Sequence, residues 1–228
     1  MLQRDQDIYA SAPLRRLLDD QMRAMAPDLQ RCFGAHALLV GAAADDAPPA
    51  RSMFSCWTRL RVDNGRYRGD LQAATDEPLP FVDDAFELVM LRHALEVVAE
   101  PSALLAEAIR ILAPGGVLVM TGVHPLSGWA PWFYWRARGT RPVLQLPLQL
   151  GQMVQRAGLD IERTRRVGRI WPGTTAASSA GVSACGGGYV LIARKRHRAA
   201  TPLRIKPVPL RVPANSQLSP GTRRSSVL

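Results

Sequence analysis

The chain has 228 residues, enough for one substantial domain and too few for two of ordinary size. Its content of 47% hydrophobic and 21% charged residues is ordinary for a soluble globular protein. The formal net charge of +10 is unevenly distributed: nine of the 29 Lys and Arg residues, and none of the Asp and Glu residues, lie from Arg194 to the end, which leaves 20 basic against 19 acidic residues before that point.

Targeting and cysteine patterns narrow the protein class further. The N-terminal residues lack the apolar core of a signal peptide, and no apolar run approaches the length of a membrane span. Cys32, Cys56 and Cys185 stand at unrelated spacings, which predicts neither a disulfide framework nor a zinc site. We therefore expect a soluble, cytoplasmic protein that holds no metal.

Residues 1–11 are predicted to form a short flexible leader, and a helix is predicted from Pro13 onward, with Ser11 as a suitable N-cap. Apolar residues recur at helical intervals at Leu14, Leu17, Leu18, Met22 and Met25. We expect this amphipathic helix to pack against the edge of a sheet, where it could also shield a ligand.

A strand at residues 37–40 leads directly into a turn at Gly41. Two acids and two prolines then fall within residues 45–50, so the helix that normally follows such a turn is expected to be short or missing. After a strand at residues 55–62, the Asp-Asn-Gly sequence at residues 63–65 predicts a hairpin turn into a second strand at residues 66–73.

The clearest pattern of the chain lies in residues 79–122. A short apolar run at residues 86–91 has the length of a strand that is buried on both faces. Apolar residues recur at helical spacing after Pro101, which predicts a helix, and the Pro-Gly-Gly sequence at residues 114–116 is expected to end it. A second strand is predicted at residues 117–121. Two parallel strands joined by a helix with a right-handed crossover form an α/β unit.

The remaining elements complete a domain predicted to span residues 12–196. Five aromatic residues cluster in residues 129–135, which predicts either an apolar substrate pocket or a helix packed into the core or against a partner. A helix is predicted at residues 146–159, followed by strands at residues 161–167 and 189–193.

Residues 197–228 form a basic tail in which repeated prolines predict disorder. Its charge has two interpretations: a solvated extension, or a segment that makes non-specific contact with nucleic acid or anionic lipid.

Residues 79–122 contain the strings LPF, FELV and RILAPGGVL in this order. In order and spacing they resemble one half of the class I, Rossmann-like S-adenosylmethionine-dependent methyltransferases of the type-11 group. The flanking strings SAPLRRLLDD, FGAHALLVG and GGGYVLIARKR are similar to a small bacterial subgroup, the YafS-like methyltransferase-domain proteins. The resemblance extends over residues 11–206 and is tight only in residues 79–122.

The resemblance implies an α/β fold, a Rossmann-like three-layer sandwich with a mostly parallel sheet. In this chain a reduced β-hairpin is expected to replace the second strand-helix unit. The resemblance also implies S-adenosylmethionine as the cofactor. In the family pattern an acidic residue stands two places before a G-x-G-x-G loop. Here Gly41 matches the first glycine, Ala43 and Asp45 occupy the next two positions, and Leu39 replaces the acid. Without the resemblance, this stretch would be an ordinary strand-to-helix turn.

Further cofactor-binding positions follow from the same resemblance. Asp63 falls near the acid that holds the ribose, although a turn aspartate without a ligand is the alternative. Thr75 and Asp76 occupy the region that meets the adenine. Leu91 and Arg92 lead into the corner beneath the transferred methyl group, with a solvated side chain as the alternative for Arg92.

Two histidines are candidates for a catalytic base, if the acceptor must lose a proton. His93 follows Arg92 in that corner, and a structural histidine at the start of the next helix is the alternative. His124 lies in the segment that the family places on the substrate side.

The resulting hypothesis is a methyltransferase that uses S-adenosylmethionine and acts on a small-molecule or unknown acceptor. The alternative is a catalytically degenerate binding protein of the same fold that has lost the cofactor. A nicotinamide-dependent oxidoreductase would need G-x-G-x-x-G after the first strand, and residues 41–46 do not supply it.

Overall fold

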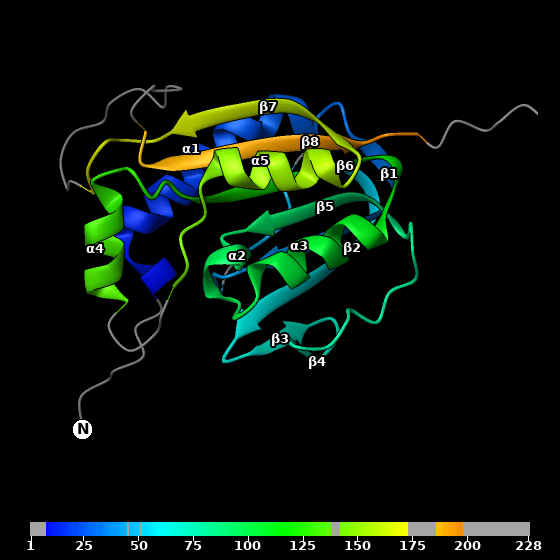
Figure 1. The fold of residues 1–228 in the computed structure, drawn as a ribbon, viewed down its shortest axis with the longest axis horizontal. Helices are drawn as coiled ribbons and strands as arrows, with labels where there is room; N and C mark the ends of the chain where they lie inside the picture. The colour runs from blue at the N-terminus through cyan, green and yellow to red at the C-terminus, as the bar shows by residue number, and fades with distance from the viewer. Residues whose placement is uncertain (1–7, 45, 51, 138–141, 173–185, 198–228) are drawn as a thin grey trace, which may run out of the picture. The chain divides into compact units, whose positions relative to one another are not determined.

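A mixed β-sheet forms the centre of the protein (Figure 1), in a computed structural model that describes residues 8–44, 46–50, 52–137, 142–172 and 186–197. In these residues the sheet has eight strands in the order β4-β3-β2-β1-β5-β6-β8-β7. The strands are β1 (Phe33–Gly41), β2 (Met53–Asp63), β3 (Arg66–Gly69), β4 (Ala73–Ala74), β5 (Phe86–Arg92), β6 (Leu112–Val123), β7 (Leu159–Val167) and β8 (Gly188–Lys195).

The expected mostly parallel arrangement is found in the centre of the sheet. β2, β1, β5 and β6 pair in parallel, whereas β3, β4, β7 and β8 are added by antiparallel pairing. Counted by direction, β3 and β8 run opposite to the other six strands. This is the Rossmann-like α/β fold that the sequence predicted.

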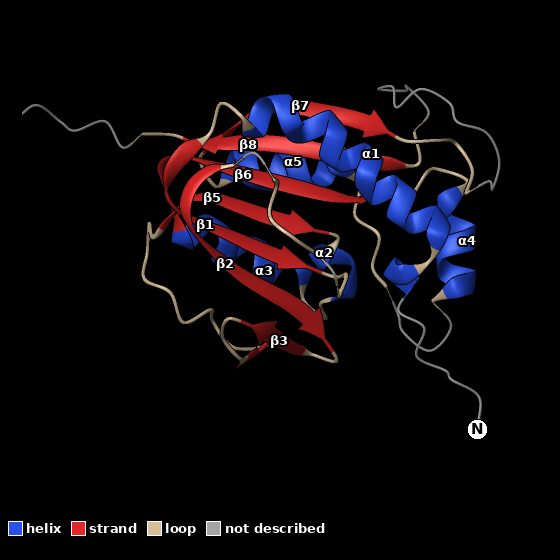
Figure 2. Ribbon diagram, turned by 180° about the vertical axis from the view of Figure 1, so that it is seen from behind, coloured by secondary structure: helices blue, strands red, loops and turns tan. Residues whose placement is uncertain are grey.

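Helices lie on both faces of the sheet. α2, α3 and α5 cover one face in Figure 1, and α1 lies over the β7 and β8 side of the other face in Figure 2. α4 lies beyond the ends of the strands in both views. The helices are the 3₁₀ helix η1 (Ile8–Ala10), α1 (Ala12–Leu29), α2 (Ala94–Val97), α3 (Pro101–Ile111), α4 (Trp129–Arg136) and α5 (Pro147–Arg156).

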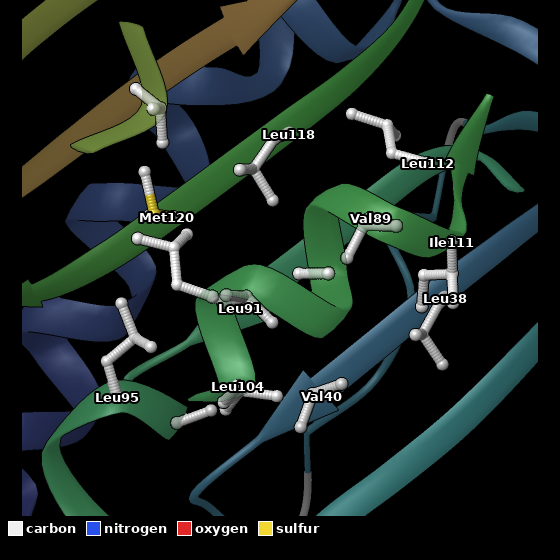
Figure 3. Packing of buried hydrophobic residues seen from close by; sticks show 14 of the residues in the cluster. Leu38, Val40, Val89, Leu91, Leu95, Leu104, Ile111, Leu112, Leu118 and Met120 are labelled. Atoms are coloured by element: carbon white, nitrogen blue, oxygen red, sulfur yellow. The ribbon is translucent and has the colours of Figure 1, made fainter. Parts of the chain in front are cut away.

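The central strands are buried on both faces, which explains their continuous apolar sequence. Alternate residues of β1, β5 and β6 pack under α2 and α3 (Figure 3), and the residues between them face α1. The first set includes Leu38, Val40, Val89, Leu91, Leu118 and Met120. The second set includes Ala37, Leu39, Leu88, Met90, Val117 and Val119.

Several predicted boundaries differ from the structure. The strand predicted at residues 66–73 is divided into β3, which ends at Gly69, and the short β4, and the helix predicted at residues 146–159 ends at Arg156. β1 begins at Phe33 rather than at residue 37, and β6 begins at Leu112 rather than at residue 117. The Pro-Gly-Gly sequence does follow the end of α3, but it lies inside an extended strand. The pairing of β5 with β6 jumps from Leu112 to Val117, because the intervening residues bulge out of the ladder.

The segment between β1 and β2 is the main departure from a regular alternation of strands and helices. Its described residues form no helix, as expected, and Asp45 lies outside them. The predicted hairpin is confirmed, since β2 and β3 pair on either side of Asn64 and Gly65. In the described part, α1 is the helix on its face of the sheet, and its main strand contacts are with β8 and β7 (Figure 2).

Several predictions fall outside the described residues: most of the leader, Cys185, and the tail from residue 198 onward. Among the described helices, none has both the length and the apolar character needed to cross a membrane.

Candidate functional site

The carboxyl ends of β1 and β5 meet at a point where the chain changes direction across the sheet. β1 is followed by β2 on one side, and β5 lies on its other side. In open α/β sheets, ligands bind at such a switch point, outside the carboxyl ends of the strands. Here the backbone N–H of Ala42 donates to the carbonyl of Arg92 at 3.0 Å, and Gly41 forms an isolated bridge with His93. Gly41, Ala43 and Arg92, three of the cofactor-binding candidates, are thus brought together.

A buried ion pair occupies this point. Arg92 Nη1 lies 2.9 Å from Asp46 Oδ1, and the two side chains are only 9% and 8% exposed. The other carboxylate oxygen of Asp46 accepts the backbone N–H of Ala43 at 3.2 Å. A Cβ on Gly41 would collide with this same oxygen. The solvated alternative for Arg92 is therefore wrong, and the open space beside Gly41 holds a carboxylate of the chain itself.

The ribose and adenine candidates form a separate group at the hairpin. Asp63 is the last residue of β2, two residues beyond Arg61, the partner of Gly41 in the sheet. Its carboxylate accepts Asn64 Nδ2 at 3.0 Å and lies 3.5 Å from Arg68 Nε. Thr75 donates its hydroxyl to the carbonyl of Gly65 at 3.0 Å, and Asp76 is exposed. In the described structure Asp63 and Thr75 hold the hairpin turn.

Leu91 is placed differently from the rest of the candidates. Its side chain is 1% exposed and belongs to the apolar core under α2 and α3. Only its backbone, paired with Val40 and Met120, lies near the strand ends.

His93 is fully buried in a polar network that joins α1 to the sheet. Its Nδ1 lies 2.9 Å from Glu96 Oε2, and its Nε2 lies 2.8 Å from Gln21 Oε1. The amide nitrogen of Gln21 already donates to the carbonyls of Gly122 and Tyr189, at 3.0 and 3.3 Å. The Gln21 oxygen must therefore accept a hydrogen bond from the N–H at His93 Nε2.

The same network surrounds the carboxylate of Glu96. The Tyr9 hydroxyl donates to Glu96 Oε2 at 3.0 Å, and the backbone N–H of Val123 donates to Oε1. His93 adopts a left-handed backbone with φ of 56°, which is uncommon for a residue with a side chain. With both ring nitrogens engaged and no exposed surface, this geometry favours the structural alternative for His93 over a catalytic base.

Tyr189 lies beside this network without joining it. Its hydroxyl is buried and has no hydrogen-bond partner among the described residues, and burial together with the Glu96 carboxylate raises the pKa of Tyr189 well above its usual value. A Cβ on Gly122 would lie 2.6 Å from this hydroxyl and 2.8 Å from Glu96 Oε1. Glycine at residue 122 therefore lets both groups approach the strand.

His124 follows β6 and is half-buried. Its Nδ1 accepts the backbone N–H of Leu126 at 3.1 Å, so the neutral ring carries its proton on Nε2. Burial and the Arg166 guanidinium lower the pKa of His124. The ring is therefore neutral at pH 7, with its lone pair already used within the loop.

The aromatic cluster forms α4, and its two sides behave differently. Trp129 and Phe133 are buried against Tyr9 and the first turns of α1, whereas Tyr134 and Trp135 are half-exposed. The indole N–H of Trp129 donates to the carbonyl of Arg169 at 2.8 Å. The core-packing interpretation holds for the buried side of the helix.

A pocket of ≈ 160 Å³ lies between the β1–β2 segment and the hairpin. Pockets that bury drug-sized ligands measure about 300–1,000 Å³. A whole adenosyl cofactor therefore needs more room than this pocket offers while Asp46 stays in place. The pocket is lined by Leu39, Ala43, Ala44, Asp46, Arg59, Leu60, Arg61, Arg68, Gly69 and Asp70.

Sequence reasoning missed three residues of the site. Asp46 stands in the acidic, proline-containing segment that is expected to shorten a helix, and no local pattern marks it as the partner of Arg92. Gln21 stands on the apolar stripe of α1 at helical spacing from Leu17, Leu18 and Met25, and a polar residue at a core position was the available signal. Glu96 stands three residues after His93, the spacing at which helical side chains meet.

Known proteins match both the sequence and the fold. The family model described as Methyltransferase domain matches residues 50–120. YafS of Escherichia coli is 28% identical over 123 residues, which cover 53% of this chain and 50% of YafS. The demethylmenaquinone methyltransferase of Renibacterium salmoninarum is 38% identical over 77 residues, 33% of this chain and 30% of that protein.

The fold comparison is broader. The crystal structure of an S-adenosylmethionine-dependent methyltransferase from Archaeoglobus fulgidus superimposes with a TM-score of 0.55 at 14% identity, covering 79% of this chain and 94% of that one. This chain has the class I methyltransferase fold. Residues 50–120 are similar to a methyltransferase domain, and this likeness together with the shared fold supports S-adenosylmethionine as the cofactor. The chain with this methyltransferase fold spans half or less of the length of the curated relatives it matches.

Proposed function

We propose that the protein is a methyltransferase that uses S-adenosylmethionine and acts on a small-molecule or other acceptor still to be identified. The observation that carries this proposal is the meeting of Gly41, Ala43 and Arg92 at the switch point of the sheet. The family match of residues 50–120 supports it, because that segment includes the strand β5, which ends at Arg92.

The groups at this point suit part of the cofactor. A backbone N–H and a guanidinium both face one carboxylate there, and the amino-acid half of S-adenosylmethionine carries a carboxylate. The glycine at residue 41 leaves the space that a carboxylate needs. The chemistry fits, on the condition that Asp46 leaves this position.

When bound, S-adenosylmethionine supplies a methyl group on a sulfonium, which leaves readily. The chain therefore mainly has to hold the acceptor in line and exclude water. On this proposal Gly41, Ala43 and Arg92 hold the amino-acid end of the cofactor. Asp63 accepts hydrogen bonds from the ribose, and residues 75–76 border the adenine.

Binding of S-adenosylhomocysteine, measured by isothermal titration calorimetry, tests the proposal without knowledge of the acceptor. Micromolar binding supports the methyltransferase, whereas no heat at millimolar ligand supports the degenerate scaffold. Asp63→Ala is expected to weaken binding about tenfold or more, because it removes a charged hydrogen-bond acceptor. Asp160→Ala, which removes an exposed carboxylate paired with Arg196, is the control and should bind as the natural chain does.

A further inference from the structure

The donors that hold the Asp46 carboxylate are arranged as a binding site for a carboxylate in general. The Ala43 N–H lies 3.2 Å from one oxygen of Asp46, and Arg92 Nη1 lies 2.9 Å from the other. An N–H and a guanidinium on the two oxygens of one carboxylate are a common mode of carboxylate recognition. Nothing in this geometry requires that the carboxylate come from the chain itself.

We propose that Arg92 and the Ala43 N–H form the subsite for the carboxylate of the cofactor's amino-acid half, and that Asp46 occupies this subsite until the ligand displaces it. The inference rests on the proposed function. It also gives a function to the irregular segment between β1 and β2, which carries Asp46. Asp46 acts as an internal competitor, so it sets the affinity for ligands that carry a carboxylate at this end.

The location of Asp46 allows the exchange. The described residues between β1 and β2 belong to neither a helix nor a strand, so this segment can move without breaking a ladder or a helical turn. Arg92, in contrast, ends β5 in the centre of the sheet and stays in place. The small pocket beside Ala43 would widen when the Asp46 side chain moves away, because Asp46 forms part of its wall.

A different result is expected if the ion pair of Arg92 and Asp46 is purely structural. A structural pair would affect the stability of the fold but not distinguish between ligands with and without a carboxylate. An internal competitor weakens only the ligands that need its position, by the fraction of molecules in which the position is free. Two adenosyl compounds separate these cases: S-adenosylhomocysteine, which has the amino-acid half, and 5′-methylthioadenosine, which lacks it.

The experiment measures the affinity of both compounds by calorimetry for the natural chain, Asp46→Asn, Arg92→Gln and the double variant. Asp46→Asn keeps an acceptor for the Ala43 N–H and removes the charge that holds Arg92. We expect it to raise the affinity for S-adenosylhomocysteine about tenfold, which is the gain expected if Asp46 leaves the subsite free in about one natural molecule of ten. The affinity for 5′-methylthioadenosine should not change. Arg92→Gln should weaken S-adenosylhomocysteine alone and remove the gain in the double variant.

Asp28→Asn is the matched control, because Asp28 is also a poorly exposed carboxylate beside arginines, Arg163 and Arg165, on another part of the fold. A second readout is the hydrogen exchange of the Ala43 amide, which Asp46→Asn should accelerate and bound S-adenosylhomocysteine should slow again. Arg92→Gln tests the subsite independently if Asp46→Asn does not fold.

The outcomes separate the inference from the proposed function. If the natural chain and Asp46→Asn bind S-adenosylhomocysteine equally, or if the affinities for both compounds change in parallel, Asp46 is not an internal competitor. Either result leaves the proposed methyltransferase function intact. Absence of binding by either compound to any folded variant overturns the proposed function together with the subsite.

Discussion

Glu96 is the single residue on which the buried polar network most depends. It accepts hydrogen bonds from Tyr9 and Val123, lies 2.9 Å from His93 Nδ1 and has almost no exposed surface. Glu96→Gln places an amide group where donors already point, so one of them loses its partner. We expect the free energy of unfolding in urea to fall by about 1–3 kcal/mol.

The control for this prediction is an acid of the same type at the surface. Glu162 pairs with Arg194, and both side chains are about 40% exposed. Exposed pairs contribute about 0–1 kcal/mol, so Glu162→Gln should change the unfolding free energy little. Similar losses in the two variants would show that the network does not stabilise the fold.

The ionisation of His124 also belongs to the single-residue scale. Burial and the charge of Arg166 lower its pKa from the ordinary value of 6.5. The unfolded chain therefore gains a proton at higher pH than the folded chain. The contribution of His124 to stability is present above pH 6.5 and is lost as the pH falls through this value toward the lower folded pKa.

Arginine substitution separates the two causes of this shift. NMR titration of the His124 ring should give a midpoint below 6.5 in the natural chain. Arg166→Gln should move that midpoint upward without restoring the ordinary value, because burial remains. Arg156→Gln removes an exposed arginine of α5 and should leave the midpoint unchanged. An unchanged midpoint in Arg166→Gln would exclude the electrostatic contribution.

At the scale of elements, the β2–β3 hairpin depends on two residues with left-handed backbone. Asn64 has φ of 48° and Gly65 has φ of 73°. These angles suit the two-residue turns that match the twist of the strands. A Cβ on Gly65 would be 3.8 Å from Thr75 Oγ1, so alanine fits in space. Gly65→Ala should therefore cost about 1–2 kcal/mol through backbone conformation alone.

The urea unfolding of Gly65→Ala and Asn64→Gly tests this account of the turn. Asn64→Gly introduces a residue that adopts the left-handed conformation readily, so its unfolding midpoint should stay near that of the natural chain. If Gly65→Ala unfolds at the same urea concentration as Asn64→Gly, the turn conformation does not limit the stability of the hairpin.

Elements with a strong local pattern were predictable from the sequence. β5 is apolar throughout because both of its faces are buried, and the Asp-Asn-Gly turn sets the hairpin through its own backbone preferences. The start of β6 was not predictable in this way. Its first residues pair with Phe86 across a bulge, and no periodicity marks an irregular ladder.

The candidate site was only partly predictable for a related reason. The resemblance located Gly41 and Arg92, but the ion pair of Arg92 with Asp46 joins residues 46 positions apart in the sequence. The contact of Gln21 with His93 spans 72 positions. Spacing rules report which face of a helix or strand a residue occupies, and they do not report which distant side chain it will meet.

At the scale of the whole molecule, charge divides the chain into two parts. Up to residue 193 the basic and acidic residues nearly balance, and nine basic residues follow without an acid. Six of these nine lie in residues 198–228. Residues 1–197 hold 23 basic and 19 acidic residues, whereas the tail holds six basic residues and no acid, so most of any electrostatic affinity of this protein for RNA is expected to come from the tail.

The salt dependence of RNA binding tests this division. A chain that ends at residue 197 is compared with the full chain, using a labelled single-stranded RNA of mixed sequence. If all six basic residues of the tail neutralise phosphates, the slope of log affinity against log salt concentration becomes shallower by about 4 on their removal, at roughly 0.7 for each phosphate. A full-length variant with these six residues changed to Gln should show the same slope as the truncated chain, because the effect depends on charge rather than on length. Equal slopes for the full and truncated chains would instead identify the tail as a solvated extension that does not bind RNA.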